Sequence, residues 1–492
     1  MITTLIKNGL VYDGSGLEPV RKDILIRNER IARLGDFSRK KADVVIDATG
    51  ALVLPGFIDI NSSVDHYLDI LSADGGAENL KKGITTAIGG NCGSSLAPSS
   101  GVGSLKSVRK WGDVSKVNVG WHTVQEFLKI LEKRKIALNF GTLVGHSTIR
   151  RSIIGEDFRD LTDREMATFK KMIVESFKNG AFGFSTGLEF AHSKKVGQNE
   201  ILELVRVVAA HKRIYATHLR DLNNETGFKN SIEEIFDLAK ITGANVEISH
   251  LLPLNGLGNE YLEAKSLIER ETADTHINFD CYSIPRVAYP VYQLLPKPVK
   301  EGNLETMLKQ INSEYLEASI LKHFKNINPD SLTLYNLQGS LKFLSGKTLK
   351  QLSESFDMKS EQALLKVMRL SHLRAVVLLG IVDEQSLEEF LASPSSIIAS
   401  GGLNFSPVFT DFLKWAKDNS KISLQAAVMK TTSIPAKKLG IKKRGLLKED
   451  YYADLVLLRD FKPTEVIVNG ALVLENNAIK NHSKGRVLRY AD

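Results

Sequence analysis

Apolar residues along the chain form short runs that alternate with longer stretches of helical periodicity. Near-continuous apolar runs are typical of strands that are buried on both faces of a parallel sheet. The intervals at 161–178, 198–211, 231–242 and 260–272 have the spacing of amphipathic helices. The strand-like runs are Phe57–Asn61, Thr85–Asn91, Leu138–Val144, Phe182–Thr186, Ile214–His218, Asn245–His250, Ile277–Tyr282 and Ser396–Ser400.

Eight repeats of strand and helix predict a closed parallel (β/α)8 barrel of the TIM type, in the α/β fold class. An open, doubly wound parallel sheet is the alternative architecture for the same alternation. No Gly-x-Gly-x-x-Gly sequence follows the first predicted strand, although such a sequence is typical of dinucleotide-binding open sheets. The pattern therefore favours the barrel.

The two ends of the chain have a different pattern, in which short strands are separated by turn residues. Strands are predicted at 4–7, 23–27, 30–34 and 43–47, and again at 453–458, 465–474 and 486–489, with a hairpin turn at Asn469-Gly470. Neither end has enough apolar surface to form a stable sheet alone. We therefore expect residues 1–55 and 430–492 to form one composite β-sandwich domain, beside a barrel domain over residues 56–429.

The interval between the seventh and eighth predicted strands, from Tyr282 to Ser396, is much longer than the others. It contains prolines within 285–298, amphipathic helical patterns near 301–327 and a strand-like run at 331–334. We predict an inserted subdomain over residues 286–348, before the eighth strand. Insertions at a barrel mouth act as lids or specificity elements.

The charge of the chain adds little to this prediction. The net charge of +8 is compatible with an anionic partner, but 57 acidic residues are mixed among 65 basic ones. The basic clusters are short, as at 39–41, 133–135 and 442–444. We expect a solvated, lysine-rich surface and no nucleic-acid partner.

The cysteine content and the absence of long apolar runs indicate the cellular compartment. Two cysteines, Cys92 and Cys281, argue against a disulfide scaffold and for a reducing environment. The amino-terminal residues lack the apolar core of a signal peptide, and no apolar run approaches the length of a membrane span. We expect a cytoplasmic protein without membrane contact, and no oligomeric state follows from the sequence.

Three residues with metal-binding side chains lie at the ends of predicted strands. Cys92 follows the second strand, His218 ends the fifth and His250 ends the sixth. The carboxyl ends of barrel strands are where active-site groups collect. One thiolate and two imidazoles, with a fourth position left open, are suitable ligands for a hydrolytic zinc. The sequence therefore predicts one zinc ion per chain.

Several segments of the chain resemble the N-acyl-D-amino-acid deacylases, or D-aminoacylases, of the amidohydrolase superfamily. The resemblance extends over essentially the whole length, and the Gly-Asn-Cys-Gly sequence that contains Cys92 is its most specific part. The matching segments are Leu54–Asp59, Gly83–Thr86, Gly90–Pro98, Leu143–His146, Gly183–Glu189, Ala216–Arg220, Ile248–His250 and Tyr452–Val456.

The resemblance implies a zinc-bearing barrel, a β-sandwich from both chain ends and an insertion before the eighth strand. It also implies that Cys92, His218 and His250 hold the tightly bound zinc. The implied reaction is hydrolysis of the C–N bond of a small-molecule amide, by a water that the zinc activates.

Other positions differ from the pattern of these deacylases. Asn61 and Ser63 replace the His-x-His that binds a weaker second metal, and neutral amides and hydroxyls are poor zinc ligands. Gly401 stands where the family has the aspartate that acts as general base, so the proton shuttle is relocated or missing. Leu252 stands where a lysine usually helps to hold the substrate carboxylate. These changes indicate a substrate other than a plain N-acyl-D-amino acid.

Several nearby residues are candidates for the missing roles. Asp65 and His66 follow the first predicted strand and His146 ends the third strand, so each is a candidate proton shuttle. Asp280 in the seventh predicted strand is a further polar group that could face the mouth. For each of these side chains taken alone, a structural role as a satisfied polar group at a strand end is favoured over a catalytic one.

Two more residues are candidates for binding the substrate. Arg220 is predicted to pair with an anionic substrate or with Asp221. Tyr282 resembles a family tyrosine near the substrate and is a candidate donor to an oxyanion. Glu189 is expected to cap a helix rather than to line the mouth.

Two hypotheses of different kinds follow. The first is a zinc-dependent amidohydrolase with one metal ion and a relocated proton shuttle. The second is a catalytically inactive homologue that acts as a metal-binding or partner-binding protein. Retention of all three predicted zinc ligands favours the first hypothesis. Gly401, Asn61 and Ser63 favour the second for the ancestral reaction.

Overall fold

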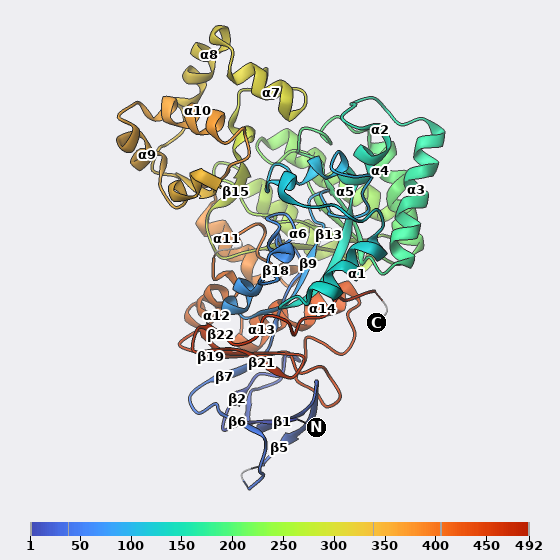
Figure 1. The fold of residues 1–492 in the computed structure, drawn as a ribbon, viewed down its shortest axis with the longest axis vertical. Coiled ribbons are helices and arrows are strands. Elements are labelled where there is room, and N and C mark those ends of the chain that lie inside the picture. Colours follow the sequence, from blue (N-terminus) through green and yellow to red (C-terminus); the bar gives the residue numbers. More distant parts are fainter. Residues whose placement is uncertain (1, 38, 338, 404–405, 491–492) are drawn as a thin grey trace.

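The computed structural model describes residues 2–37, 39–337, 339–403 and 406–490, without the side chains of residues 116 and 272–274. Its centre is an eight-stranded parallel sheet in the order β18-β14-β13-β12-β11-β10-β9-β8 (Figure 1). These strands are β8 (Phe57–Asp59), β9 (Ile84–Gly89), β10 (Asn139–Gly145), β11 (Gly183–Gly187), β12 (Ile214–His218), β13 (Asn245–Ile248), β14 (Ile277–Cys281) and β18 (Ser396–Ile398). All eight predicted strands are confirmed, and the barrel is preferred over the open sheet.

The barrel is nearly closed. The strands β8 and β18 form no ladder with each other, but hydrogen bonds join their ends at the mouth: Gly401 N donates to Asn61 O at 3.1 Å, and Ser400 N donates to the Asp59 carboxylate at 3.0 Å. Along β12, Ile214 and Ala216 pack inside the barrel, whereas Tyr215 between them packs under the helices. This alternation places the next inward position, His218, at the mouth.

Helices surround the barrel on the outside (Figure 1). Two of them begin at a capping box; in one, Thr162 Oγ1 accepts from Glu165 N, and the Glu165 carboxylate accepts from Thr162 N in return. The α-helices of this layer are α1 (Val124–Arg134), α2 (His146–Ile154), α3 (Asp163–Lys178), α4 (Gln198–Ala210), α5 (Glu225–Thr242), α6 (Gly258–Thr275), α11 (Glu384–Ala392), α12 (Val408–Asn419), α13 (Leu424–Thr431) and α14 (Ser433–Leu439). Short 3-10 helices cover 69–71, 77–82, 104–107 and 114–116.

The chain ends form two further sheets, and the seven-stranded one combines strands from both ends, as the sequence predicts. One sheet has the order β5-β4-β1-β6, and the other has the order β22-β21-β20-β19-β7-β2-β3. Their strands are β1 (Thr3–Lys7), β2 (Leu10–Val11), β3 (Val20–Arg21), β4 (Asp23–Arg27), β5 (Arg30–Gly35), β6 (Val44–Asp47), β7 (Leu52–Pro55), β19 (Leu455–Arg459), β20 (Lys462–Val468), β21 (Ala471–Glu475) and β22 (Ala478–Ile479). Apolar side chains of both sheets share one core, which includes Ile24, Ile26, Val53 and Leu455.

One predicted terminal strand is wrong. Residues 486–489 do not join either terminal sheet; Val487 forms only an isolated bridge to Phe140 of β10. Leu488 N donates to Phe140 O at 2.7 Å, and the Leu488 side chain is buried with the interior of the barrel. Leu488 is thus buried against the barrel instead of against the two terminal sheets. Helices α13 and α14 lie within 424–439, and the first carboxyl-terminal strand begins at Leu455. The predicted domain boundaries stay a prediction.

The segment between β14 and α11 forms a separate unit at one side of the barrel mouth (Figure 1). It contains β15 (Val287–Pro290), α7 (Leu304–Ile311), α8 (Glu314–Phe324), β16 (Leu332–Asn336), α9 (Leu349–Phe356), α10 (Ser360–Leu370), β17 (Val376–Leu379) and 3-10 helices at 291–294 and 339–344. Its sheet has the order β15-β17-β16. The middle strand, β17, therefore lies beyond residue 348, the predicted end of the insertion. The sequence did not predict this strand, because pairing between distant segments is not visible in local patterns.

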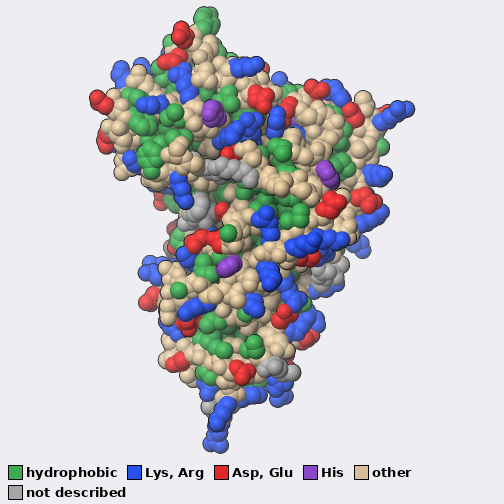
Figure 2. Space-filling model, viewed as in Figure 1, with side chains coloured by type: hydrophobic (Ala, Val, Ile, Leu, Met, Phe, Trp, Pro, Cys, Tyr) green, Lys and Arg blue, Asp and Glu red, His purple; other side chains and the backbone are tan. Residues whose placement is uncertain are grey.

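The molecular surface carries both signs of charge. On the face shown in Figure 2, lysine and arginine side chains are interspersed with aspartate and glutamate. This distribution matches the mixed charge expected from the sequence. No helix among the described residues combines the length and the apolar composition that crossing a bilayer requires.

Candidate metal centre

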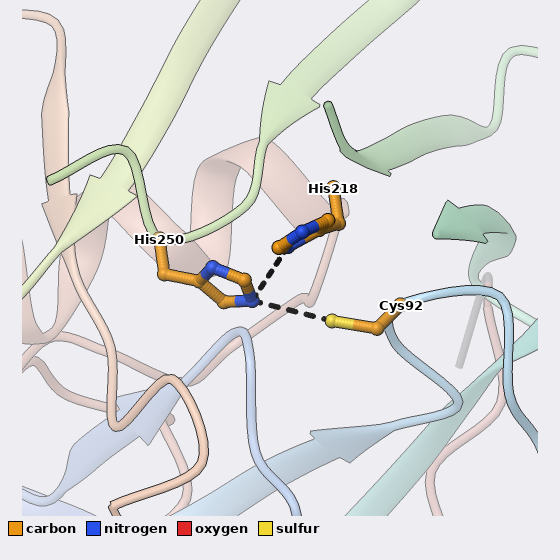
Figure 3. Close-up of side chains that lie close together, drawn as sticks. All are labelled: Cys92, His218 and His250. Carbon is orange, nitrogen blue, oxygen red and sulfur yellow. Dashed lines mark hydrogen bonds between the residues drawn. The ribbon is translucent and has the colours of Figure 1, made fainter. Parts of the chain in front are cut away.

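Three side chains with metal-binding atoms converge at the mouth of the barrel (Figure 3). Cys92 Sγ lies 3.3 Å from His250 Nε2, and His218 Nδ1 lies 3.4 Å from the same nitrogen. The three atoms are all within 4.8 Å of one another. Across the described ranges, no second group of His, Cys, Asp and Glu side chains clusters in this way. The structure therefore brings together the three residues that the sequence singled out.

Two of the three separations between these atoms fit a tetrahedral zinc ion. Bond lengths of about 2.0–2.1 Å for Zn–N and about 2.3 Å for Zn–S place the ligand atoms of a tetrahedral site about 3.3–3.6 Å apart. The two measured separations, 3.3 and 3.4 Å, agree with that range. Two imidazoles and one thiolate are also a preferred zinc donor set, and three ligands leave one position open.

The backbone is unusual at two of the three residues. Cys92 has φ +50° and His250 has φ +35°, in the left-handed region that non-glycine residues rarely occupy. Such conformations persist where the surrounding structure enforces them, and they cluster at functional sites. A Cβ on Gly187 would lie 2.4 Å from Cys92 O, so glycine at the end of β11 allows this close approach. The loop after β9 is thereby held against the strands that present the histidines.

A carboxylate orients one of the histidines. Glu189 Oε2 lies 2.8 Å from His218 Nε2, so the Nε2–H is donated to the carboxylate and the Nδ1 lone pair faces His250. Asn223 Nδ2 donates to the other Glu189 oxygen at 2.8 Å. This carboxylate–histidine arrangement is typical of metal sites. The expectation that Glu189 caps a helix is therefore wrong. Its position just after the end of β11 was the signal in the sequence that could have placed it near the metal site.

A buried aspartate supports the site from below. Asp280 Oδ1 accepts from His250 N at 2.8 Å, and Asp280 Oδ2 accepts from Asn61 Nδ2 at 3.0 Å. Burial raises the pKa of Asp280 to about 7. Both of its oxygens are engaged by the loop that carries His250 and by the end of β8. Asp280 thus fixes backbone and amide groups around the cavity.

The cavity around Cys92, His218 and His250 is mainly apolar. Residues of β15 cover one side, so the inserted segment contributes to the wall. The described residues that line it are Asn61, Ser63, His66, Cys92, Trp111, Phe190, His218, Leu222, His250, Leu252, Leu254, Tyr261, Val287, Ala288, Tyr289, Pro290, Gly401 and Gly402. None of these described lining residues is a lysine or an arginine.

The three candidate proton shuttles have different positions. His66 lines the cavity; its Nε2 lies 2.9 Å from Ser94 O and its ring stacks on Trp111. Burial lowers the pKa of His66, which favours the neutral imidazole. Asp65 lies outside the cavity lining, where its carboxylate accepts from Gly90 N at 2.7 Å. His146 is buried against α4 and bonds to Glu200 at 2.8 Å, away from the cavity.

The two candidate substrate-binding residues also lie outside the cavity lining. Arg220 forms a two-pronged pair with Glu234, at 3.0 and 2.9 Å, and donates to Lys194 O and Val196 O. Arg220 therefore neither pairs with Asp221 nor points into the cavity lining. Its carboxylate partner is Glu234 of α5, a contact that the local sequence did not reveal. Tyr282 is fully buried, and burial raises the pKa of its phenol.

The Tyr282 ring occupies the space beside Gly401. A Cβ at residue 401 would lie 2.6 Å from Tyr282 Cε1 and 3.0 Å from Cδ1. Gly401 also has φ +54°, where any other residue is strained. Residue 401 therefore has no room for a carboxylate side chain unless Tyr282 moves.

This crowding predicts a loss of stability in Gly401→Ala. Gly50→Ala is the matched control, since Gly50 has φ +77° but no atom within 4 Å of its added Cβ. We expect Gly401→Ala to lower the free energy of unfolding by about 1–3 kcal/mol more than Gly50→Ala, because only residue 401 is overpacked. Urea denaturation measures both. Equal losses would mean that Tyr282 yields readily and that a carboxylate fits.

Comparison with known proteins is consistent with the geometry. A model of the Amidohydrolase family matches residues 44–372. The chain is 29% identical to the D-aminoacylase of Alcaligenes xylosoxydans xylosoxydans over 516 residues, covering 98% of this chain and 97% of that protein. It is 28% identical to the N-acyl-D-aspartate deacylase of the same organism over 474 residues, covering 94% and 86%.

Solved structures show the same fold. A crystal structure of D-aminoacylase superposes with a TM-score of 0.78 at 25% identity, covering 99% of both chains. N-acyl-D-glutamate deacylase from Bordetella bronchiseptica, in complex with zinc and a phosphonate inhibitor, superposes with a TM-score of 0.79 at 22% identity, again covering 99% of both chains.

Proposed function

The chain belongs to the amidohydrolase family, and from this premise we propose that it is a zinc-dependent hydrolase of a C–N bond in a small amide. The observation that carries the proposal is the convergence of Cys92 Sγ, His218 Nδ1 and His250 Nε2 within 4.8 Å at the carboxyl ends of barrel strands. This is the end of the barrel at which enzymes of this architecture place their active sites.

Cys92, His218 and His250 would hold one zinc ion. The zinc supplies a Lewis acid that polarises the amide carbonyl and acidifies water. Glu189 keeps His218 in the tautomer whose Nδ1 is free to bind. Asn61 and Ser63 line the same cavity with neutral groups, which bind zinc poorly, so we propose one ion per chain. A study of D-aminoacylase describes one-metal activation and second-metal attenuation in its binuclear centre, which supports a one-metal enzyme.

His66 is the proposed proton carrier. Among the described residues that line the cavity, it is the one imidazole outside the candidate ligand set. Its Nε2–H is donated to Ser94 O, and Nδ1 is then the basic nitrogen. A neutral imidazole can accept a proton from water and return it to the departing amine, which is the role left open at Gly401.

The lining of the cavity points to a neutral substrate. Leu252, Leu222 and Leu254 surround the space next to the ligands, and no described cation lines it. A carboxylate beside the scissile amide would be a buried, unpaired charge there, which is strongly unfavourable. We therefore propose an apolar amide without an adjacent carboxylate.

This substrate class predicts a measurable selectivity. The kcat/KM for an N-acyl amino acid carboxamide should exceed that for the corresponding free acid by at least about tenfold, the factor for 1.4 kcal/mol. Leu252→Lys should narrow or reverse the ratio by adding a cation, whereas Leu252→Met should keep it. Equal kcat/KM values for acid and carboxamide in the unmodified enzyme would contradict the assignment.

A second candidate function rests on the crowding at Gly401. Without a carboxylate there, the protein could bind zinc and yet have no hydrolytic activity. Elemental analysis and a hydrolysis screen separate the two functions. The screen should contain N-acyl amino acids and carboxamides of both configurations, dipeptides and cyclic amides. We expect one zinc per chain and turnover of an amide; stoichiometric zinc with no turnover would favour the inactive homologue.

A further inference from the structure

A second cavity lies beside the candidate metal site and shares Phe190 with it. The Phe190 ring stacks on the His218 ring, with centroids 4.9 Å apart, and Lys110 Nζ lies 4.3 Å from the Phe190 centroid. We call this cavity the Lys110 pocket. Residues after β9, the helix α2 and the start of α7 line it, including Lys106, Arg109, Lys110, Ser147, Arg151 and Asn303.

The lining of the Lys110 pocket carries an excess of positive charge. Its basic side chains are Lys106, Arg109, Lys110 and Arg151, and its carboxylates are Glu156 and Glu305. Glu305 pairs with Lys106 at 3.2 Å and with Arg109 at 3.3 Å, while Glu156 pairs with Arg151 at 2.6 Å. Within the described part of the chain, no carboxylate lies within ion-pair distance of Lys110.

Lys110 is also short of hydrogen-bond acceptors. Its side chain is buried, at 8% exposure, and Nζ donates to Ser94 Oγ at 2.8 Å and to Ser107 O at 3.0 Å. An ammonium has three donors. Both partners are neutral and only two donors are used, so one N–H of Lys110 remains for a ligand in the pocket. Burial and the neighbouring Arg151 lower the pKa of Lys110 to about 7, so its ammonium form lacks a compensating negative charge. The Phe190 ring stabilises the charge but accepts no conventional hydrogen bond.

Two other buried lysines show how this protein satisfies an ammonium group. Lys430 Nζ donates to Ser393 O, Ser396 O and Ser396 Oγ. Lys438 Nζ donates to Val246 O, His276 O and Asn278 Oδ1, between 2.7 and 2.9 Å. Each has three oxygen acceptors, whereas Lys110 has two. Lys110 lines the cavity, so a ligand bound there could supply the third acceptor.

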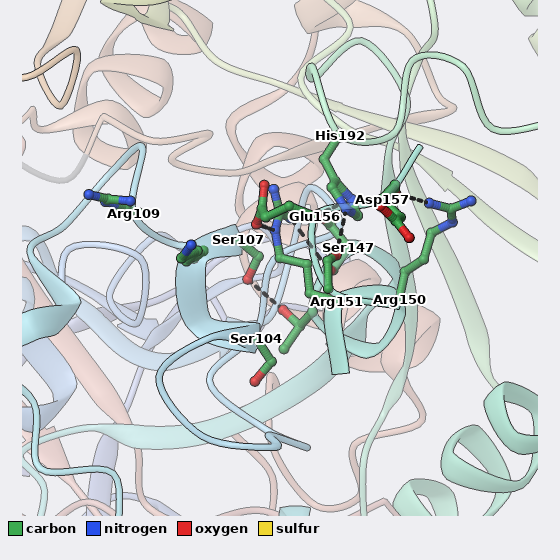
Figure 4. Close-up of polar contacts among 12 residues, drawn as sticks. Ser104, Ser107, Arg109, Ser147, Arg150, Arg151, Glu156, Asp157 and His192 are labelled. Carbon is green, nitrogen blue, oxygen red and sulfur yellow. Dashed lines mark hydrogen bonds and ion pairs between the residues drawn. The ribbon is translucent and has the colours of Figure 1, made fainter. Parts of the chain in front are cut away.

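Arg151 presents a second group to the same space (Figure 4). Its Nε donates to Glu156 Oε1 and its Nη1 donates to Ser147, so Nη2 remains without an acceptor among the residues that the structure describes. Burial, Arg151 and Arg150 all lower the pKa of His192, which reflects the positive field at this point. The amino-terminal end of α7, which begins at Leu304, adds its dipole at the rim.

We propose that the Lys110 pocket binds a small oxyanion, a carboxylate or a phosphate group, between Lys110 Nζ and Arg151 Nη2. Such an anion supplies the acceptor that both donors lack and compensates the buried charge of Lys110. The side chain of Phe190 stands between this pocket and the amide cavity, so the anion is a ligand separate from the amide substrate. The site is distinct from the candidate zinc ligands and does not depend on the proposed hydrolysis.

Isothermal titration of the full-length protein with inorganic phosphate, and separately with succinate, tests the proposal and identifies which oxyanion is preferred. We expect binding of at least one anion by the unmodified protein. Lys110→Met should weaken that binding at least about tenfold, because a charge-assisted hydrogen bond is lost. Lys430→Met is the matched control, since it removes a buried lysine outside the pocket, and it should keep the affinity.

Arg151→Gln provides an independent variant if Lys110→Met does not fold, and it should weaken anion binding by a similar factor. Zinc content should be unchanged in Arg151→Gln, because Arg151 does not belong to the candidate metal site. Lys110→Met does not serve for this control, since the charge of Lys110 lowers the pKa of Cys92. No binding of phosphate or succinate by the unmodified protein would overturn the proposal. Unchanged affinity in the folded pocket variants would also overturn it.

Discussion

Replacing Cys92 with alanine is expected to remove bound zinc from the purified protein and to abolish amide hydrolysis. Cys92 supplies one of only three candidate ligands, and its sulfur lies 3.3 Å from His250 Nε2. Changes in outer-shell partners alone weaken metal binding by about 10–100-fold, so loss of a direct ligand should exceed about 100-fold. Elemental analysis after dialysis against a weak chelator measures the effect.

Cys281→Ala is the matched control. Cys281 is the other buried cysteine, but it packs near Phe390 O and does not belong to the metal-binding group. This variant should retain one zinc per chain and its activity. Full zinc content in Cys92→Ala would show that the ion is held by other residues.

Replacing His66 with glutamine is expected to lower kcat by about 10²–10⁴-fold, the usual contribution of general acid–base catalysis. Glutamine can still donate to Ser94 O, as His66 Nε2 does at 2.9 Å. The substitution therefore removes the basic nitrogen while keeping a donor at the same place. Steady-state kinetics on a neutral amide, together with zinc analysis of the same preparation, measure the effect.

His146→Gln distinguishes loss of a proton carrier from general damage to the barrel. His146 is equally buried and hydrogen-bonded, but it bonds to Glu200 outside the cavity. We expect its kcat to remain close to that of the unmodified enzyme. A kcat for His66→Gln that is unchanged, with zinc still present, would assign the proton transfer to another group.

Local patterns in the sequence predicted the barrel and the three converging residues. Alternation along Ile214–His218 places His218 on the inward face, and strand ends meet at one rim in a parallel barrel. For Cys92 and His250 the direction depends on left-handed backbone positions that follow their strands. Their sequence positions were informative because the motifs around them resemble those of known deacylases.

Contacts between distant elements could not be predicted in this way. Glu189 reaches His218 from the end of the neighbouring strand, and Arg220 is engaged by Glu234 of α5. His146 faces α4 instead of the mouth because the first turn of α2 begins there. The ring of Tyr282 leaves little room for a side chain at Gly401, and only the packed structure reveals this crowding. The middle strand β17 of the inserted sheet was missed for the same reason.

X-ray absorption spectroscopy at the zinc edge tests the central claim most directly. If one ion is shared by Cys92, His218 and His250, the spectrum of the zinc-loaded protein should contain one sulfur at about 2.3 Å and two imidazole nitrogens at about 2.0–2.1 Å. The sulfur contribution should disappear in Cys92→Ala and persist in Cys281→Ala. A zinc spectrum with only oxygen and nitrogen neighbours in the unmodified protein would contradict the account.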